Sequence, residues 1–187
     1  RSYGWPEDER FLVPDRARRH MRTAVERGRR LRETWEERLR AYEDEHPEAA
    51  RRFAAARAGD LPEGWDDDLP DFEAGDGPVA TRKASGAALG TLAPRIPWLM
   101  GGSADLTGSN KTHMEGAPIL QADTPEGRNL RWGVREHVMA GATSGMALHG
   151  GVRPFAATFF VFTDYARPAL RLAAMMELPV IYVLTHD

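Results

Sequence analysis

Apolar residues recur every three or four positions between residues 15 and 45, and charged residues fill most positions between them. This period predicts an α-helix with one apolar stripe. Its members are Met21, Val25, Leu31, Trp35, Leu39 and Tyr42. His46-Pro47 predicts the end of this helix, and Pro47 can begin a second helix that runs to about Ala58. One apolar stripe needs a partner surface, so we expect residues 1–73 to be an extended helical segment rather than a self-sufficient domain.

Helical and strand patterns alternate after residue 79. The expected helices cover residues 82–92 (ending before Pro94), 134–148 and 160–176, and the expected strands cover 98–100, 129–132, 152–159 and 179–184. Alternation of this kind is typical of a parallel sheet with right-handed crossovers. Residues 180–184 are continuously apolar, which predicts a strand buried on both faces. The predicted fold class is therefore α/β, a mostly parallel sheet flanked by helices and preceded by a helical linker.

Parallel sheets of this class bind ligands at the carboxyl ends of their strands. The stretches 101–110 and 185–187 fall there, as does Glu136, which is expected half out of water near the start of a helix. A carboxyl group partly removed from water can share a proton with a ring nitrogen of a bound cofactor. A carboxylate at a helix start also stabilises the helix dipole, and the neighbours of Glu136 alone favour this second interpretation. Residues 111–128 are polar and are expected to form a mobile excursion.

The composition excludes several classes of protein. The chain has 187 residues, 42% hydrophobic content and a net charge of -3, which allows a core and does not indicate a nucleic-acid binder. It has no cysteine, and therefore no disulfide framework or thiolate metal site. It shows no signal-peptide pattern and no apolar run that could cross a bilayer. These features fit a cytoplasmic protein. Because Arg1 stands first and a strand-like run stands last, we expect a fragment of a longer protein.

Six stretches together resemble the central portion of the transketolase family. They are ATRKAS at 80–85, GGSADLTGSN at 101–110, WGVRE at 132–136, LHGG at 148–151, TFFVFTDYAR at 158–167 and THD at 185–187. Each stretch alone is weak evidence for the family, but six stretches in the family's order and spacing are a specific signal. Residues 1–73 match more loosely. The resemblance implies a helical interdomain linker over residues 1–78 and a pyrimidine-binding domain, truncated at its C-terminal end, over residues 79–187.

The resemblance implies thiamine diphosphate as cofactor and the transfer of a two-carbon ketol unit from a ketose phosphate to an aldose phosphate. It implies that Glu136 is the catalytic glutamate that contacts the aminopyrimidine ring. Phe159, Phe162 and Tyr165 match the aromatic pocket for this ring, with Phe162 as the first candidate for stacking. Ordinary core packing is the alternative role for these three aromatic residues. Asp105 matches an aspartate that approaches the cofactor across the subunit boundary.

The resemblance also implies contacts with substrate, metal and a second subunit. Arg82, Ser109 and His186 match positions that hold the sugar phosphate. The family's site forms between two subunits, so a cytoplasmic homodimer of the pentose phosphate pathway is expected, and this chain alone is predicted to be inactive. Mg²⁺ or Ca²⁺ ligands are expected upstream, and none in this chain. Residues 75–77, Gly-Asp-Gly, lack the Asn pair of the family's magnesium motif and predict a turn.

Two alternatives stay open at this point. The chain could come from a related thiamine diphosphate enzyme, such as dihydroxyacetone synthase or deoxyxylulose phosphate synthase, or it could be a non-catalytic split subunit. Arg82 with Ser109 and His186 favours transketolase-like binding of phosphorylated sugars. Glu136 together with the aromatic set argues against a purely structural role.

Overall fold

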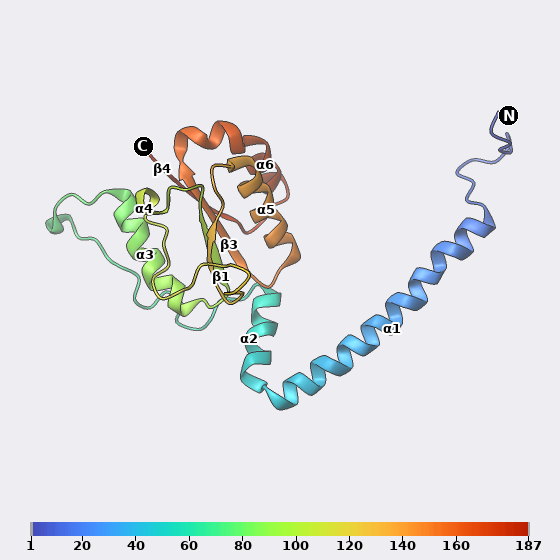
Figure 1. The fold of residues 1–187 in the computed structure, drawn as a ribbon, viewed down its shortest axis with the longest axis horizontal. Helices are drawn as coiled ribbons and strands as arrows, with labels where there is room; N and C mark the ends of the chain where they lie inside the picture. Colours follow the sequence, from blue (N-terminus) through green and yellow to red (C-terminus); the bar gives the residue numbers. More distant parts are fainter. Residues whose placement is uncertain (1, 187) are drawn as a thin grey trace. The chain divides into compact units, whose positions relative to one another are not determined.

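The computed structural model describes residues 2–186 and divides into two compact units, Arg1–Arg51 and Arg52–Asp187 (Figure 1). Helix α1 (Asp15–Glu45) lies in the first unit, and α2 (Pro47–Ala58) spans the boundary between the units. Both helices have the predicted bounds. The backbone N–H of His46 closes α1 by donating to the carbonyl of Tyr42 at 2.8 Å. All 31 residues of α1 lie in the described part of the chain, and none of them is buried.

The second unit is built on a four-stranded, wholly parallel sheet with the strand order β2-β1-β3-β4. The strands are β1 (Leu99–Ser103), β2 (Asn129–Arg131), β3 (Arg153–Phe159) and β4 (Ile181–Thr185). The helices of this unit beyond α2 are α3 (Thr81–Arg95), the short α4 (Thr107–Asn110), α5 (Glu136–His149) and α6 (Thr163–Met175), with 3-10 turns η1 (Ala74–Asp76) and η2 (Phe160–Phe162). Figure 1 shows α3 on one side of the sheet and α5 with α6 on the other. The predicted α/β class is confirmed.

Strand β3 is the centre of the core. Its residues from Pro154 to Thr158 are all buried. Successive side chains of a strand point to opposite faces, and accordingly Phe155 packs in the cluster that includes Ile96 and Met114, whereas Ala156 packs with Ala104 and Met139. Both faces of β3 are therefore covered.

The first strand extends further than predicted, because Gly101 and Gly102 belong to β1 and not to a loop. These glycines lie where neighbouring strands approach closely. A Cβ at Gly101 would lie 2.1 Å from the carbonyl oxygen of Phe155, and one at Gly102 would lie 1.8 Å from that of Leu130. The two glycines therefore permit close strand packing rather than a turn.

Several predicted helix bounds were also wrong. The helix expected from residue 134 begins only at Glu136. Helix α3 continues to Arg95 through Pro94, because a proline in the last turn removes few helical hydrogen bonds, and the N–H of Ile96 still donates to the carbonyl of Leu92 at 2.9 Å. Residues 160–162 form the 3-10 turn η2, so that α6 begins only at Thr163.

Strand β4 is not buried on both faces, contrary to its apolar pattern. Ile181 and Leu184 are 45% and 37% exposed. Within the described residues, β4 pairs with β3 on one side and forms an edge of the sheet. An apolar run predicts a strand but does not say which neighbours cover it.

The excursion over residues 111–128 is anchored rather than loose. The side chain of Asn129 accepts from the N–H of Met114 at 2.9 Å and donates to the carbonyls of Met114 and Ala117 at 2.9 and 2.8 Å. The Arg128 guanidinium donates to three carbonyls near the end of α3 and the start of β1. Met114 is fully buried. Polar composition suggested mobility, but Asn129 satisfies backbone groups of the loop and Arg128 ties the loop to α3 and β1. In the part of the chain that the structure describes, no helix combines the length and hydropathy needed to span a membrane.

Candidate functional site

Glu136 is the first residue of α5, and its side chain is more buried than the sequence suggested, at 5% exposure. The chain turns into this helix at Gly133, whose φ of 68° favours glycine. The Glu136 Oε1 atom accepts a long hydrogen bond of 3.5 Å from the Thr158 hydroxyl of β3. Within residues 2–186, no other donor to this carboxylate is present. A carboxylate can accept about four hydrogen bonds, so Glu136 keeps most of its capacity for a ligand.

Glu136 opens onto a cleft of about 490 Å³ that Phe162 and Tyr165 also line. The rings of Phe159 and Phe162 are 6.2 Å apart at 22°, and those of Phe162 and Tyr165 are 6.3 Å apart at 34°. These distances are typical of interacting aromatic rings. The three predicted aromatic residues thus form one series, with Phe162 and Tyr165 facing the same space as Glu136.

The aromatic series does not lie on one helix, although its spacing resembles a helical face. Phe159 ends β3, Phe162 ends η2, and Tyr165 lies in the first turn of α6. The change from strand to 3-10 turn to α-helix is what brings the three rings into one series. Tyr165 is 66% exposed, so its ring is not part of the core.

A buried hydrogen-bond chain joins the carboxyl ends of β1 and β4. The Ser103 hydroxyl donates to Asn110 Oδ1 at 2.8 Å, and Asn110 Nδ2 donates to the Thr185 hydroxyl at 2.6 Å. Ser109 precedes Asn110, and His186 follows Thr185. These hydrogen bonds therefore hold the segments of Ser109 and His186, two of the predicted phosphate-binding residues, together at the carboxyl ends of the strands. The sequence did not predict this series of hydrogen bonds, because Asn110 and Thr185 are 75 positions apart.

The remaining predicted site residues lie outside the Glu136 cleft. Asp105 follows β1, is exposed and has a left-handed φ of 58°, a conformation that aspartate tolerates better than most residues. Arg82 is half-buried in the first turn of α3. Neither residue is among the described residues that line the cleft with Glu136, and the same holds for Ser109.

Three further charged residues lie in the stretches 132–136 and 158–167 that resemble the family. Asp164 and Arg167 pair with one another. Arg135 instead donates to the carbonyl of Trp132 at 3.2 Å. Over residues 2–186, no group of three or more His, Cys, Asp or Glu side chains forms a potential metal site.

The fold and the cleft define a class of protein: a parallel α/β domain with a buried carboxylate and aromatic rings at the carboxyl end of its sheet. Comparison with known families specifies it further. Residues 77–187 match the transketolase pyrimidine binding domain, and residues 1–62 match the transketolase thiamine diphosphate binding domain. The chain belongs to the transketolase family, as its sequence motifs predicted. The boundary drawn between linker and pyrimidine domain at residue 78 stays a prediction.

Curated relatives and solved structures agree with this assignment. The transketolases of Geobacillus stearothermophilus and Bacillus subtilis are 51% and 46% identical to the chain over its whole length, which corresponds to 28% of each relative. The solved transketolase from Leishmania mexicana matches with a TM-score of 0.91 at 40% identity. A transketolase from Pichia stipitis, solved in complex with sedoheptulose 7-phosphate, matches with a TM-score of 0.91 at 36% identity. Each of these matches covers 100% of this chain and 28% of the solved chain.

Proposed function

We propose that the chain supplies the pyrimidine-binding half of a thiamine diphosphate site in a transketolase. The enzyme would transfer a two-carbon ketol unit from a ketose phosphate to an aldose phosphate. The observation that carries this proposal is the shared cleft, in which the carboxylate of Glu136 lies beside the rings of Phe162 and Tyr165. Membership of the transketolase family supports the choice of cofactor and reaction.

The side chains of the cleft fit an aminopyrimidine ring. Aromatic faces suit a flat heterocycle, and a buried carboxylate with a single long hydrogen bond needs a further polar partner. A ring nitrogen at the Glu136 carboxylate would provide that partner. Thiamine diphosphate, when bound, supplies the carbanion chemistry, and the protein orients it and controls its protonation.

Four residues in and beside the cleft have roles in this proposal. Glu136 holds or releases a proton at its carboxylate oxygen, next to the ring nitrogen. An aspartate would fall one methylene short, and a glutamine could donate a hydrogen bond but could not exchange the proton. Phe162 and Tyr165 orient the ring and exclude water, while the Thr158 hydroxyl orients the carboxylate from β3.

The sugar phosphate and the second subunit complete the proposed site. Arg82, Ser109 and His186 would bind the phosphate group, and the buried chain through Asn110 and Thr185 supports the placement of the last two. Asp105 would approach the cofactor held by the other subunit of a homodimer. Mg²⁺ or Ca²⁺ would be held by residues outside this chain. We place this enzyme in the cytoplasm and in the pentose phosphate pathway.

A coupled ketol-transfer assay tests the proposed function. The complete gene product that contains this chain is assayed with xylulose 5-phosphate and ribose 5-phosphate, with and without thiamine diphosphate and Mg²⁺. Cofactor-dependent activity should fall by about 10²-fold or more in Glu136→Ala. Glu126→Ala, which removes an exposed carboxylate elsewhere, should retain activity. A folded, cofactor-bound wild type without ketol transfer would refute the substrate assignment, and an active Glu136→Ala variant would refute the role of Glu136.

A further inference from the structure

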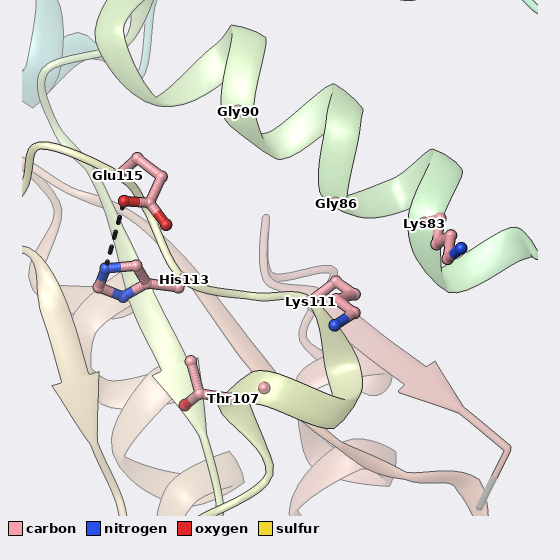
Figure 2. A pocket seen from close by; sticks show the side chains of 8 residues that line it. Lys83, Gly86, Gly90, Thr107, Lys111, His113 and Glu115 are labelled. Carbon is pink, nitrogen blue, oxygen red and sulfur yellow. Dashed lines mark ion pairs between the residues drawn. The ribbon is translucent and has the colours of Figure 1, made fainter.

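A second cavity, of about 410 Å³, lies between α3 and the segment that follows β1. We refer to it as the lysine pocket. Its walls include Lys83 and Gly86 on α3, and Thr107, Lys111, His113 and Glu115 on the opposite segment. Figure 2 shows Lys83 and Lys111 on facing walls, with the His113–Glu115 pair further along. None of the lining residues of the Glu136 cleft is shared with this cavity.

The two lysines of this pocket are the only lysines in the chain. Lysine and arginine together number 25, so every other one of these basic residues is an arginine. An ammonium group is a compact point charge, whereas a guanidinium is a planar fork. Both ammonium groups of the sequence therefore line one cavity, although all other Lys and Arg positions are arginine.

Neither ammonium group has a compensating charge. Among residues 2–186, no hydrogen bond or ion pair is formed by the side chain of Lys83 or Lys111. Glu115 is the one carboxylate that lines the pocket, and its side chain is 90% exposed and lies 3.9 Å from His113 Nε2. Two positive charges that face one cavity without a carboxylate between them attract an anion.

The backbone holds Lys111 in this position at a conformational cost. Lys111 ends α4 with a left-handed φ of 57°, a conformation that favours glycine or asparagine. Gly86 of α3 makes room for it, because a Cβ there would lie 2.8 Å from the Cβ of Lys111. Strained backbone of this kind persists where the surrounding structure fixes it, and it is concentrated at functional sites.

A buried hydroxyl next to the pocket also lacks a partner. Thr112 is 1% exposed, and its Oγ1 atom forms no hydrogen bond. It lines a small cavity of about 60 Å³ whose walls include Thr107 and His113, which also line the lysine pocket. Because buried polar groups are nearly always hydrogen-bonded, this hydroxyl is available to a polar ligand atom or to water in the smaller cavity.

We propose that the lysine pocket binds a phosphate group, either as inorganic phosphate or as a small phosphate monoester. Two ammonium groups match the two negative charges of a phosphate dianion. The hydroxyl of Thr107 provides a neutral donor in the same cavity. This inference does not rest on the proposed function, because it uses neither Glu136 nor the aromatic series.

Calorimetric titration with inorganic phosphate tests the lysine pocket. The complete gene product, with thiamine diphosphate bound, is titrated at constant ionic strength adjusted with sodium chloride. The double substitution Lys83→Gln with Lys111→Gln should weaken phosphate binding at least about tenfold. Arg171→Gln removes an exposed positive charge from α6 and should leave the affinity unchanged. Lys83→Arg with Lys111→Arg should weaken binding less, because charge is kept while the compact shape is lost.

The outcomes separate this site from the proposed phosphate contacts elsewhere. An unchanged affinity in a folded double variant would overturn the inference, as would a wild type that does not bind phosphate or an equal loss in Arg171→Gln. If the double variant does not fold, each single substitution should still weaken binding about threefold or more. In Arg82→Ala, phosphate binding to the lysine pocket should persist. Tighter binding of glycerol 3-phosphate than of phosphate would assign the ligand as a monoester, and weaker binding would assign it as free phosphate.

The inference and the proposed function fail independently of one another. Phosphate binding requires no catalysis and no intact Glu136, so it can be measured in Glu136→Ala. Retained phosphate binding in an inactive Glu136→Ala variant supports both claims. Ketol transfer in an enzyme that binds no phosphate through its lysines would refute the lysine pocket alone.

Discussion

The sheet unit contains two cavities of similar size and opposite chemistry. The cleft of about 490 Å³ combines the Glu136 carboxylate with aromatic rings, whereas the lysine pocket of about 410 Å³ combines two ammonium groups with glycines. Regular elements position the first set: a helix start, a strand end and a 3-10 turn. A left-handed residue and a close helix approach position the second set. One sheet unit therefore presents a carboxylate beside aromatic rings in one cavity and two ammonium groups in another, and the two cavities share no lining residue.

The largest expected effect is that of Glu136→Gln on turnover. The substitution keeps size and hydrogen bonding but removes the exchangeable proton, so kcat for ketol transfer should fall by about 10²–10⁴-fold. The phosphate affinity of the lysine pocket should not change, because Glu136 does not line that pocket. An unchanged affinity would show that the acid chemistry belongs to the Glu136 cleft alone. Steady-state kinetics and phosphate calorimetry on the same variant check both expectations. An equal change in kcat and in phosphate affinity would show that the two cavities do not act independently.

Asn110→Ala should destabilise the protein through the hydrogen-bond chain that anchors α4. The substitution leaves the buried hydroxyls of Ser103 and Thr185 without their partner, which costs about 1–3 kcal/mol. Because Lys111 follows Asn110 directly, phosphate binding should weaken while cofactor affinity is kept. Thermal unfolding gives the stability, with the exposed Ser109→Ala as the matched control. No loss of stability would show that the chain does not hold this end of the sheet.

Phe162→Ala should act on cofactor affinity rather than on proton transfer. The ring lies between Phe159 and Tyr165, and its removal takes away the central aromatic face of the cleft. We expect the Kd for thiamine diphosphate to rise about tenfold, corresponding to about 1.4 kcal/mol. Phe53→Ala, which removes a half-exposed ring on α2, is the control. A Kd unchanged in Phe162→Ala would assign the ring to packing instead.

The smallest expected effect is that of Thr158→Val. The hydroxyl contributes one long hydrogen bond of 3.5 Å to Glu136, and bonds of this length are weak. We expect kcat to fall only about threefold, because the burial of Glu136 persists. A loss as large as that of Glu136→Gln would show that Thr158 controls the carboxylate more strongly than its geometry indicates.

The sequence predicted most elements of the fold, and the errors have physical causes. The bounds of α1 and α2 followed from His46-Pro47 and the apolar stripe, because these signals are local. The burial of β4 was wrong because an apolar run carries no information on neighbouring strands. The role of Gly101 was also missed, since its lack of a side chain matters only through the approach of Phe155 from β3.

In the candidate site, too, residues within sequence motifs could be predicted, whereas contacts between residues far apart in the sequence could not. Family motifs predicted Glu136 and the aromatic series as site residues, and the structure places Glu136, Phe162 and Tyr165 around one cleft, with the Phe159 ring against that of Phe162. The chain through Asn110 and Thr185 could not be predicted, because its partners meet only when the strands pair. The lysine pocket was missed for the same reason: the motif around Lys83 and the loop of Lys111 lie side by side only across the space between α3 and α4.

The most direct test of the proposed role of Glu136 is a crystal structure of the complete gene product with thiamine diphosphate bound. We expect the aminopyrimidine ring to lie in the cleft against Phe162, with a ring nitrogen about 2.6–3.2 Å from a carboxylate oxygen of Glu136. An aminopyrimidine ring bound away from this cleft, or a Glu136 carboxylate without contact to the ring, would contradict it.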